Sequence, residues 1–279
     1  MNTGVAHLIA LAAYGNWALH SATTPDLTEN SSVQHVGELA FIARSPEDHV
    51  RGESVSRTMT QWYAMLRAQG VVRLALSRIP VRGWSLRSPY DLAAFDTQEH
   101  GVIVAAGPNG RTELWVPEWR VVDGLAPDRR IWGVTYRASK PPLLERFRVP
   151  APAAAIATLD AALEEIAGFS SGNHRGEWVE WFARAARLLR GQELEPPFFP
   201  DLFPPVGYSP EARRLLSACV AAWPFGGMGS WNDSAAVAIV ALPRYRTVSK
   251  KLYNALMDGI VAAANAFEAP ARVDGSIRG

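Results

Sequence analysis

The residues best suited to chemistry lie between Arg73 and His100. Arg73 and Ser77 share the more polar face of a strand-like segment, and Arg87 follows it. Glu99 begins a predicted hairpin, on a face with apolar neighbours, where desolvation would raise its pKa toward the range of a neutral-pH general base or acid. Arginines offer forked donors to a carboxylate or phosphate. The pattern therefore favours acid–base chemistry on an anionic substrate.

Aromatic residues give the same region a second possible use. The chain has 10 tryptophans, and Trp115 and Trp119, together with Trp62 and Trp84, are placed where they can stack on a flat ligand. Each of them is also explained as a core residue. Likewise, a structural ion pair between Glu99 and an arginine is an alternative to a catalytic carboxylate.

Standard catalytic signatures are absent from the sequence. It has no phosphate loop, nucleophile elbow, HExxH or paired CxxC motif, and its 6 histidines lack ligand spacing. The lone Cys219 lies in an apolar stretch and is expected to behave as a small hydrophobe. We therefore expect no metal, no cofactor and no intrachain disulfide.

The arrangement of Arg73, Arg87 and Glu99, the last within DTQEHG, resembles the bacterial β-carboline-forming Pictet–Spengler cyclases that act on tryptophan. The resemblance implies that Glu99 is the catalytic carboxylate and that Arg73 contacts an anionic group of the aldehyde. Arg87 stands near the position of the family's histidine. This departure argues against a histidine-dependent aldol step and suits a carboxylated or phosphorylated aldehyde. The substrate contacts we expect beside them are Ser77, His100 and Trp115.

Such a reaction needs little beyond orientation, an anion clamp and one carboxylate. An indole amine and an aldehyde condense to an iminium, the indole attacks it, and a base removes the ring proton. Two other functions stay open. One is a binding module, of the immunity or regulatory kind, with an aromatic interface; the other is a small-molecule hydrolase with Glu99 and His100 as its acid–base pair. The C-terminal stretch around GGMGSWND resembles uncharacterised bacterial proteins and implies no chemistry.

Hydrophobic periodicity predicts an α+β protein with strands in the first half. Strand-like runs cover residues 36–44, 71–79 and 130–137, and residues 99–119 read as a hairpin around Asn109-Gly110. A hairpin connection with an even number of residues would put Glu99, Ile103, Leu114 and Val116 on one face of the hairpin. The other face would then carry His100, Val102, Glu113 and Trp115.

One long amphipathic helix is predicted in the first half. Ser45-Pro46-Glu47 looks like a helix start, and helical spacing then continues to a stop at Gly70. The residues that carry this spacing are Val55, Met59, Trp62 and Leu66.

The second half has helical periods throughout. They involve Ile156 to Ile166, Trp178 to Leu189 with Trp181 on the apolar face, a helix opened by Ser209-Pro210, and a last helix from Leu252 to Phe267. Proline content near residues 138–152 suggests a strand-rich part at 1–145 and a helical part at 146–279, either separate or sharing one core. The glycine run 226–230 reads as a structural turn or as an anion-binding loop.

Bulk properties narrow the range of partners. The net charge is +1, which gives no global attraction to nucleic acid or an anionic membrane. No signal sequence or long apolar span is evident, so we expect a cytoplasmic protein. The expected partners are an indole amine and an aldehyde, with homodimerisation a base-rate expectation for a protein of this size.

Overall fold

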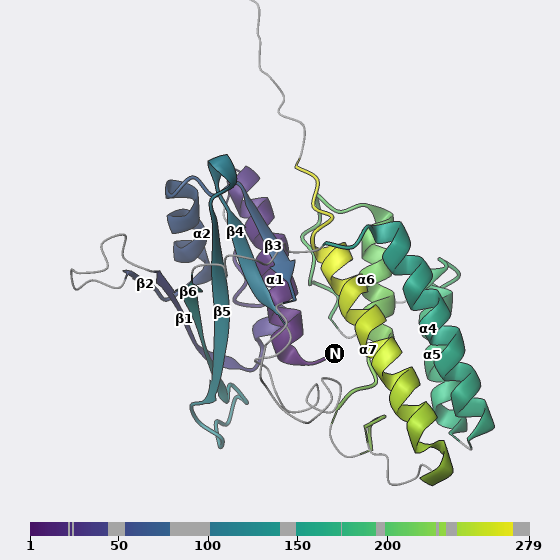
Figure 1. Ribbon diagram of the computed structural model, residues 1–279. Helices are drawn as coiled ribbons and strands as arrows, with labels where there is room; N and C mark the ends of the chain where they lie inside the picture. The colour runs from purple at the N-terminus through teal and green to yellow at the C-terminus, as the bar shows by residue number, and fades with distance from the viewer. Residues whose placement is uncertain are drawn as a thin grey trace, which may run out of the picture.

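The computed structural model describes residues 1–21, 23, 25–43, 54–78, 101–139, 149–173, 175–193, 199–226, 229–232 and 239–269. A mixed sheet occupies the N-terminal half and a helical bundle the C-terminal half (Figure 1). The predicted α+β class is therefore confirmed.

The sheet has 6 strands in the order β2-β1-β6-β5-β4-β3. β1 runs parallel to β6, and every other neighbouring pair is antiparallel. The strands are β1 (Val36–Ala43), β2 (Ser54–Ser56), β3 (Arg73–Ser77), β4 (Val102–Ala106), β5 (Thr112–Val121) and β6 (Trp132–Ser139).

Among the described residues, two helices lie against the sheet and four form the bundle (Figure 1). The helices are α1 (Thr3–His20), α2 (Met59–Ala68), α4 (Pro152–Gly172), α5 (Gly176–Leu189), α6 (Pro210–Ala222) and α7 (Leu242–Ala264). The short 3₁₀ turns are η1 (Ser31–Val33), η2 (Pro108–Gly110) and η4 (Ile239–Ala241).

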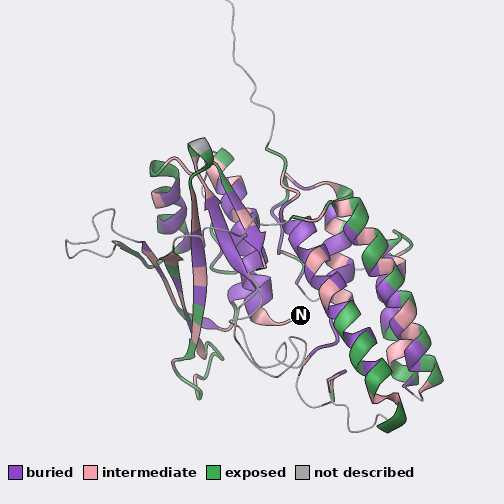
Figure 2. Cartoon of the chain, in the orientation of Figure 1, coloured by how far each residue is buried: buried purple, intermediate pink, exposed green. Residues whose placement is uncertain are grey.

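Helix α1 occupies the centre of the molecule, between the sheet and the bundle (Figure 2). Its sequence is apolar on nearly every face, as expected of a helix with neighbours on all sides. Gly15 lets α1 pack closely against α2 and β3. A Cβ at this position would lie 2.8 Å from Tyr63 Cε1 and would also clash with Leu74. The N-terminal apolar segment is thus a core helix.

The predicted helix is not continuous through Val55, and its predicted start at Ser45-Pro46-Glu47 lies outside the described residues. Helix α2 begins at Met59, after the N-cap Thr58, and Val55 lies in strand β2 opposite Ile42. Thr58 and Gln61 form a capping-box sequence pattern at the observed start of α2. The later part of the prediction holds, since Met59, Trp62 and Leu66 form the buried face.

The hairpin is confirmed, but its predicted facing is wrong. Ile103 pairs with Trp115, and Val104 pairs with Leu114. Ala106 pairs with Thr112, so residues 107–111 form a connection of odd length rather than even. Every position on β5 therefore changes face relative to β4.

As a consequence, each face of the hairpin has a different set of neighbours. Ile103 and Trp115 join the large core shared with α1 and α2. Val102, Val104 and Leu114 form a small second cluster with Ala75 and Val116. Glu99 and His100, whose faces were predicted with them, lie outside the described residues.

The bundle follows the predicted periodicity with two differences. Ser209 caps α6 by accepting the Ala212 N–H at 3.2 Å, as Ser-Pro-Glu predicted. Trp181, predicted on the apolar face of α5, is 46% exposed. Helix α7 begins at Leu242, well before the predicted Leu252.

Two asparagine side chains bind the backbone of β3 on the side away from β4. The Asn16 amide, from α1, donates to Leu74 O and accepts from Leu74 N, both at 2.8 Å. Asn265, just after α7, does the same for Leu76, again at 2.8 Å in each direction. These amides fix both α1 and α7 to one strand.

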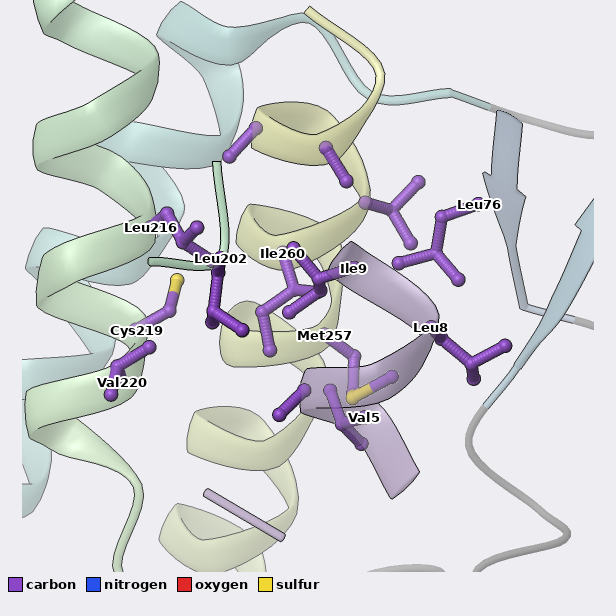
Figure 3. Packing of buried hydrophobic residues seen from close by; sticks show 14 of the residues in the cluster. Val5, Leu8, Ile9, Leu76, Leu202, Leu216, Cys219, Val220, Met257 and Ile260 are labelled. Carbon is purple, nitrogen blue, oxygen red and sulfur yellow. The ribbon is translucent and has the colours of Figure 1, made fainter. Parts of the chain in front are cut away.

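A continuous buried cluster extends from the sheet into the bundle. Figure 3 shows Ile9 of α1 near Ile260 of α7, with Leu76 of β3 beyond. The division at residues 145 and 146 stays a prediction, and the alternative of one shared core agrees with this cluster. Within the described residues, no helix is long and apolar enough to cross a membrane.

Candidate functional site

A cavity of about 470 Å³ opens where the segment after α1 meets the first residues of β1 and α2. Its walls come from those three segments and from Arg130, which precedes β6. Pockets for small organic ligands are usually of this size, with apolar walls and a few polar groups. This cavity is therefore a candidate ligand site in the described part of the chain.

Asp201, in the connection between α5 and α6, holds one wall of the cavity in place. Its backbone carbonyl accepts from Asn30 Nδ2 at 2.7 Å and from the Tyr14 hydroxyl at 3.1 Å. Its carboxylate accepts from Ser31 N at 2.8 Å and from the Ser31 hydroxyl. The helical half therefore positions a wall that the strand-rich half supplies.

The start of α2 forms the opposite wall. Thr58 Oγ1 accepts from Gln61 N at 3.2 Å, and Gln61 Oε1 accepts from Arg57 N at 2.9 Å. This capping fixes the direction in which Arg57 and Thr60 leave the helix start. The partial positive charge of a helix N-terminus adds to that of Arg57.

Both signs of charge meet at the cavity. Arg57 and Arg130 are exposed cations in its lining, and Arg130 lies 3.9 Å from Asp128. Asp26 is the carboxylate of the lining, and the pKa of Asp26 is lowered by hydrogen bonds from the backbone and side chain of Thr28. The site can therefore hold an anionic and a cationic group of one ligand.

The inner part of the cavity is apolar. Leu27, Val33, Val36 and Met59 line it and are each at most 8% exposed. A hydrophobic ligand body placed there would lose contact with water, which contributes roughly 25 cal/mol per Å² of buried apolar area. The arrangement suits binding of an amphipathic molecule.

Arg73, the predicted anion contact, is placed at the seam between the two halves. Its Nη2 donates to the carbonyl of Asn265 at 2.6 Å. The nearby Arg78 reaches α7 as well, with Nη1 3.1 Å from Asp258 Oδ1 and Nη2 3.0 Å from Asn254 Oδ1. In the structure these arginines tie β3 to the end of α7.

Ser77 and Trp115 are both buried. Ser77 is 3% exposed at the end of β3. Trp115 is fully buried, with its ring 5.3 Å from Trp62 and 6.3 Å from Phe41. These are the surroundings of core residues, and the substrate contacts predicted for them stay predictions.

The remaining predicted site residues are Glu99, Arg87 and His100. All of them lie outside the described residues. The predicted constellation is therefore not tested by the structure and stays a prediction from the sequence. Among the described residues, no group of histidine, cysteine and carboxylate side chains could hold a metal ion.

An aromatic core beneath the sheet contains a histidine that the sequence did not single out. We call it the N-terminal aromatic cluster, and its members are His7, Phe41, Trp62, Trp115, Trp119 and Tyr136. Burial lowers the pKa of His7 from 6.5 to about 3. Its Nδ1 lies 3.4 Å from the Tyr136 hydroxyl. His7 is thus a neutral core residue at physiological pH.

Sequence reasoning missed the cavity because its residues are far apart and individually ordinary. A local signal was present at Thr58-Met59-Thr60-Gln61, since this capping pattern places a helix N-terminus next to Arg57. The contribution of Asp201 has no local signal. Only the folded chain brings it to Ser31.

Comparisons with known proteins give no further guidance. No family model, no curated protein and no solved structure matches this chain. The function is therefore argued from the cavity and its chemistry.

Proposed function

We propose that this chain binds a small amphipathic organic acid, with a tryptophan-like amino acid as the first candidate. The observation that carries the proposal is a cavity with an apolar interior and with Arg57, Arg130 and Asp26 in its lining. An amino acid of this kind has a carboxylate for an arginine, an ammonium group for Asp26 and a flat apolar body for the interior.

The charges supply specificity more than affinity. Exposed ion pairs contribute only about 0–1 kcal/mol each, whereas burial of an indole body contributes more. A ligand with the apolar body and only one charged group should therefore still bind, but more weakly. This separates an amphipathic site from a purely electrostatic one.

A thermal-shift series tests the proposal. Tryptophan, tryptamine, which lacks the carboxylate, and indole-3-propionate, which lacks the ammonium group, are compared at equal concentration. We expect tryptophan to raise the Tm most, because ligand at about 100-fold above Kd stabilises a protein by roughly 2.7 kcal/mol. That corresponds to a Tm rise of several degrees for a chain of this size.

Matched arginine variants locate the binding. Arg57→Met should reduce the shift with tryptophan and with indole-3-propionate, while leaving the weaker shift with tryptamine. Arg111→Met, an exposed change outside the cavity lining, should behave like the original protein. The proposal is abandoned if no indole compound raises the Tm, or if Arg57→Met leaves all three shifts unchanged.

Cyclase chemistry on such a ligand is a further step of this proposal. It rests on Glu99, through the resemblance of its sequence surroundings to the Pictet–Spengler cyclases. With tryptophan and a carboxylated aldehyde as substrates, Glu99→Gln should abolish tetrahydro-β-carboline formation while the tryptophan thermal shift persists. Unimpaired product formation by Glu99→Gln would show that Glu99 is not the catalytic base, and an original protein without product would leave the chain as a binding protein.

A further inference from the structure

A second polar feature lies in the helical half, at the start of α5. Arg175 is the N-cap residue of this helix and is only 6% exposed. Its backbone N–H donates to Ser170 O at 3.1 Å, which fixes it to the end of α4. The side chain is thereby directed into the bundle, far in sequence from the cavity of the sheet half.

Aromatic rings surround the guanidinium of Arg175. Its Cζ lies 4.4 Å from the ring centroid of Trp231, 5.8 Å from Tyr245 and 5.9 Å from Trp178. We call these rings, with Phe169 and Phe182, the C-terminal aromatic cluster. Cation–π contacts of this kind contribute up to about 2 kcal/mol when desolvated.

Among the described residues, no carboxylate compensates the charge of Arg175. Its Nη1 atom is buried and makes no hydrogen bond, and no ion pair to a described carboxylate is present. Removal of a charge from water costs several kcal/mol even after relaxation, which exceeds the contribution of the rings. A buried arginine with a free N–H therefore calls for an anion.

The start of α5 strengthens the positive potential at this point. Its N-cap provides no side-chain hydrogen bond to the first turn, so the partial positive charge of the helix N-terminus is added to that of the guanidinium. Glu177 in the first turn is the acidic residue of this helix start, and it is exposed.

The glycine-rich turn supplies a further polar atom next to Trp231. Trp231 N donates to Pro224 O at 3.0 Å and so closes the turn over the cluster. The hydroxyl of Ser230, the preceding residue, is buried without a hydrogen-bond partner among the described residues. A hydroxyl and a guanidinium N–H are both suitable donors to an oxyanion.

We propose that Arg175 is the main ligand of an oxyanion site in the helical half, for a carboxylate or phosphate group. The anion would accept from Nη1 and neutralise the guanidinium, while the Trp231 ring covers one face of Arg175. The Ser230 hydroxyl, next to Trp231 in sequence, is a candidate for a second donor. This site is independent of the cavity in the sheet half.

Anion titrations at constant ionic strength test the site. Inorganic phosphate, acetate or benzoate replaces chloride in increasing amounts, and the Tm and tryptophan fluorescence of the protein are recorded. We expect at least one of them to raise the Tm in a saturable manner and to change the emission of Trp231. A larger Tm rise with benzoate than with acetate would identify the ligand group as a carboxylate on an aromatic body. A larger rise with phosphate than with both would identify it as a phosphate group.

Variants of Arg175 and a matched control make the result specific. Arg175→Met should abolish the anion-dependent rise in Tm. Arg175→Lys keeps the positive charge but cannot bind an anion through two parallel N–H groups, so it should weaken anion binding by about tenfold. Arg246→Met removes an exposed arginine of α7 and should change nothing. If Arg175→Met does not fold, Arg175→Lys alone decides.

Two results would overturn the proposal. One is a protein whose Tm responds to none of the anions beyond chloride. The other is an anion shift that survives at full affinity in Arg175→Lys and Arg175→Met. Either result would make Arg175 a structural cation held by its aromatic neighbours alone.

Discussion

The two aromatic clusters are built from similar rings, but their polar atoms have different hydrogen-bond partners. In the N-terminal aromatic cluster the indole N–H groups of Trp62, Trp115 and Trp119 are buried without a hydrogen-bond partner in the described structure, as is His7 Nε2. In the C-terminal aromatic cluster Trp231 Nε1 donates to Ser249 Oγ at 2.7 Å, and the Tyr245 hydroxyl donates to Trp231 O at 2.5 Å. One cluster is stabilised by burial, the other by burial and a polar network.

The difference shows why tryptophan content alone does not indicate a ligand site. Phe41 stacks on Trp62 at 4.4 Å and on Tyr136 at 5.2 Å, so ring faces in the N-terminal aromatic cluster are occupied by other rings. In the C-terminal aromatic cluster one face of Trp231 is occupied by a cation. Only the second arrangement points to a ligand of defined charge.

The largest effect should follow from truncation of Trp115. Trp115→Ala leaves a cavity among fully buried rings and should lower the free energy of unfolding by about 3–5 kcal/mol. Urea denaturation followed by circular dichroism measures this. A loss below about 1 kcal/mol would contradict the description of the N-terminal aromatic cluster as a packed core.

A fall in pH should destabilise the protein through His7 of the N-terminal aromatic cluster. Its pKa is about 3 when folded and 6.5 when exposed, so below about pH 6.5 the unfolded chain binds a proton that the folded chain does not. The contribution of neutral His7 to stability is fully present above this pH. As the pH falls from about 7.5 to about 5, this group alone should lower the free energy of unfolding by about 2 kcal/mol.

Two variants isolate that contribution. His7→Gln should flatten the decline in stability over this pH interval, as measured by urea midpoints. Tyr136→Phe removes the neighbouring hydroxyl but keeps the buried imidazole, so its decline should match that of the original protein. Equal slopes in all three proteins would show that His7 is not the cause.

The smallest effect should come from a comparison of two conservative changes. Trp231→Phe removes the donor to Ser249, whereas Trp115→Phe removes an indole N–H that bonds to nothing described. Trp231→Phe should therefore cost about 1 kcal/mol more than Trp115→Phe. Equal costs would mean that the hydrogen bond to Ser249 does not distinguish the clusters.

Local signals in the sequence predicted much of the fold. Ser209-Pro210 predicted the start of α6 because an N-cap acts on its own helix. The predicted helix wrongly included Val55 because its spacing also fits a helix, whereas the pairing of Val55 with Ile42 depends on another strand. The hairpin faces were wrong because one residue, Arg111, belongs to the connection.

The site was harder to predict because its determinants are long-range. The polar character of Arg73 suggested a ligand contact, yet its partner is a carbonyl at the end of α7. Asp201 and Arg130 converge on the segment after α1 only through the packing of the whole chain. A side chain's type limits its chemistry, whereas the neighbour it meets depends on the fold.

The asparagines that bind β3 have a consequence for self-association. β3 ends the strand order, and a terminal strand normally offers free N–H and C=O groups to another chain. Asn16 and Asn265 occupy those of Leu74 and Leu76. The β3 edge is therefore protected against pairing with the sheet of a second copy of this protein.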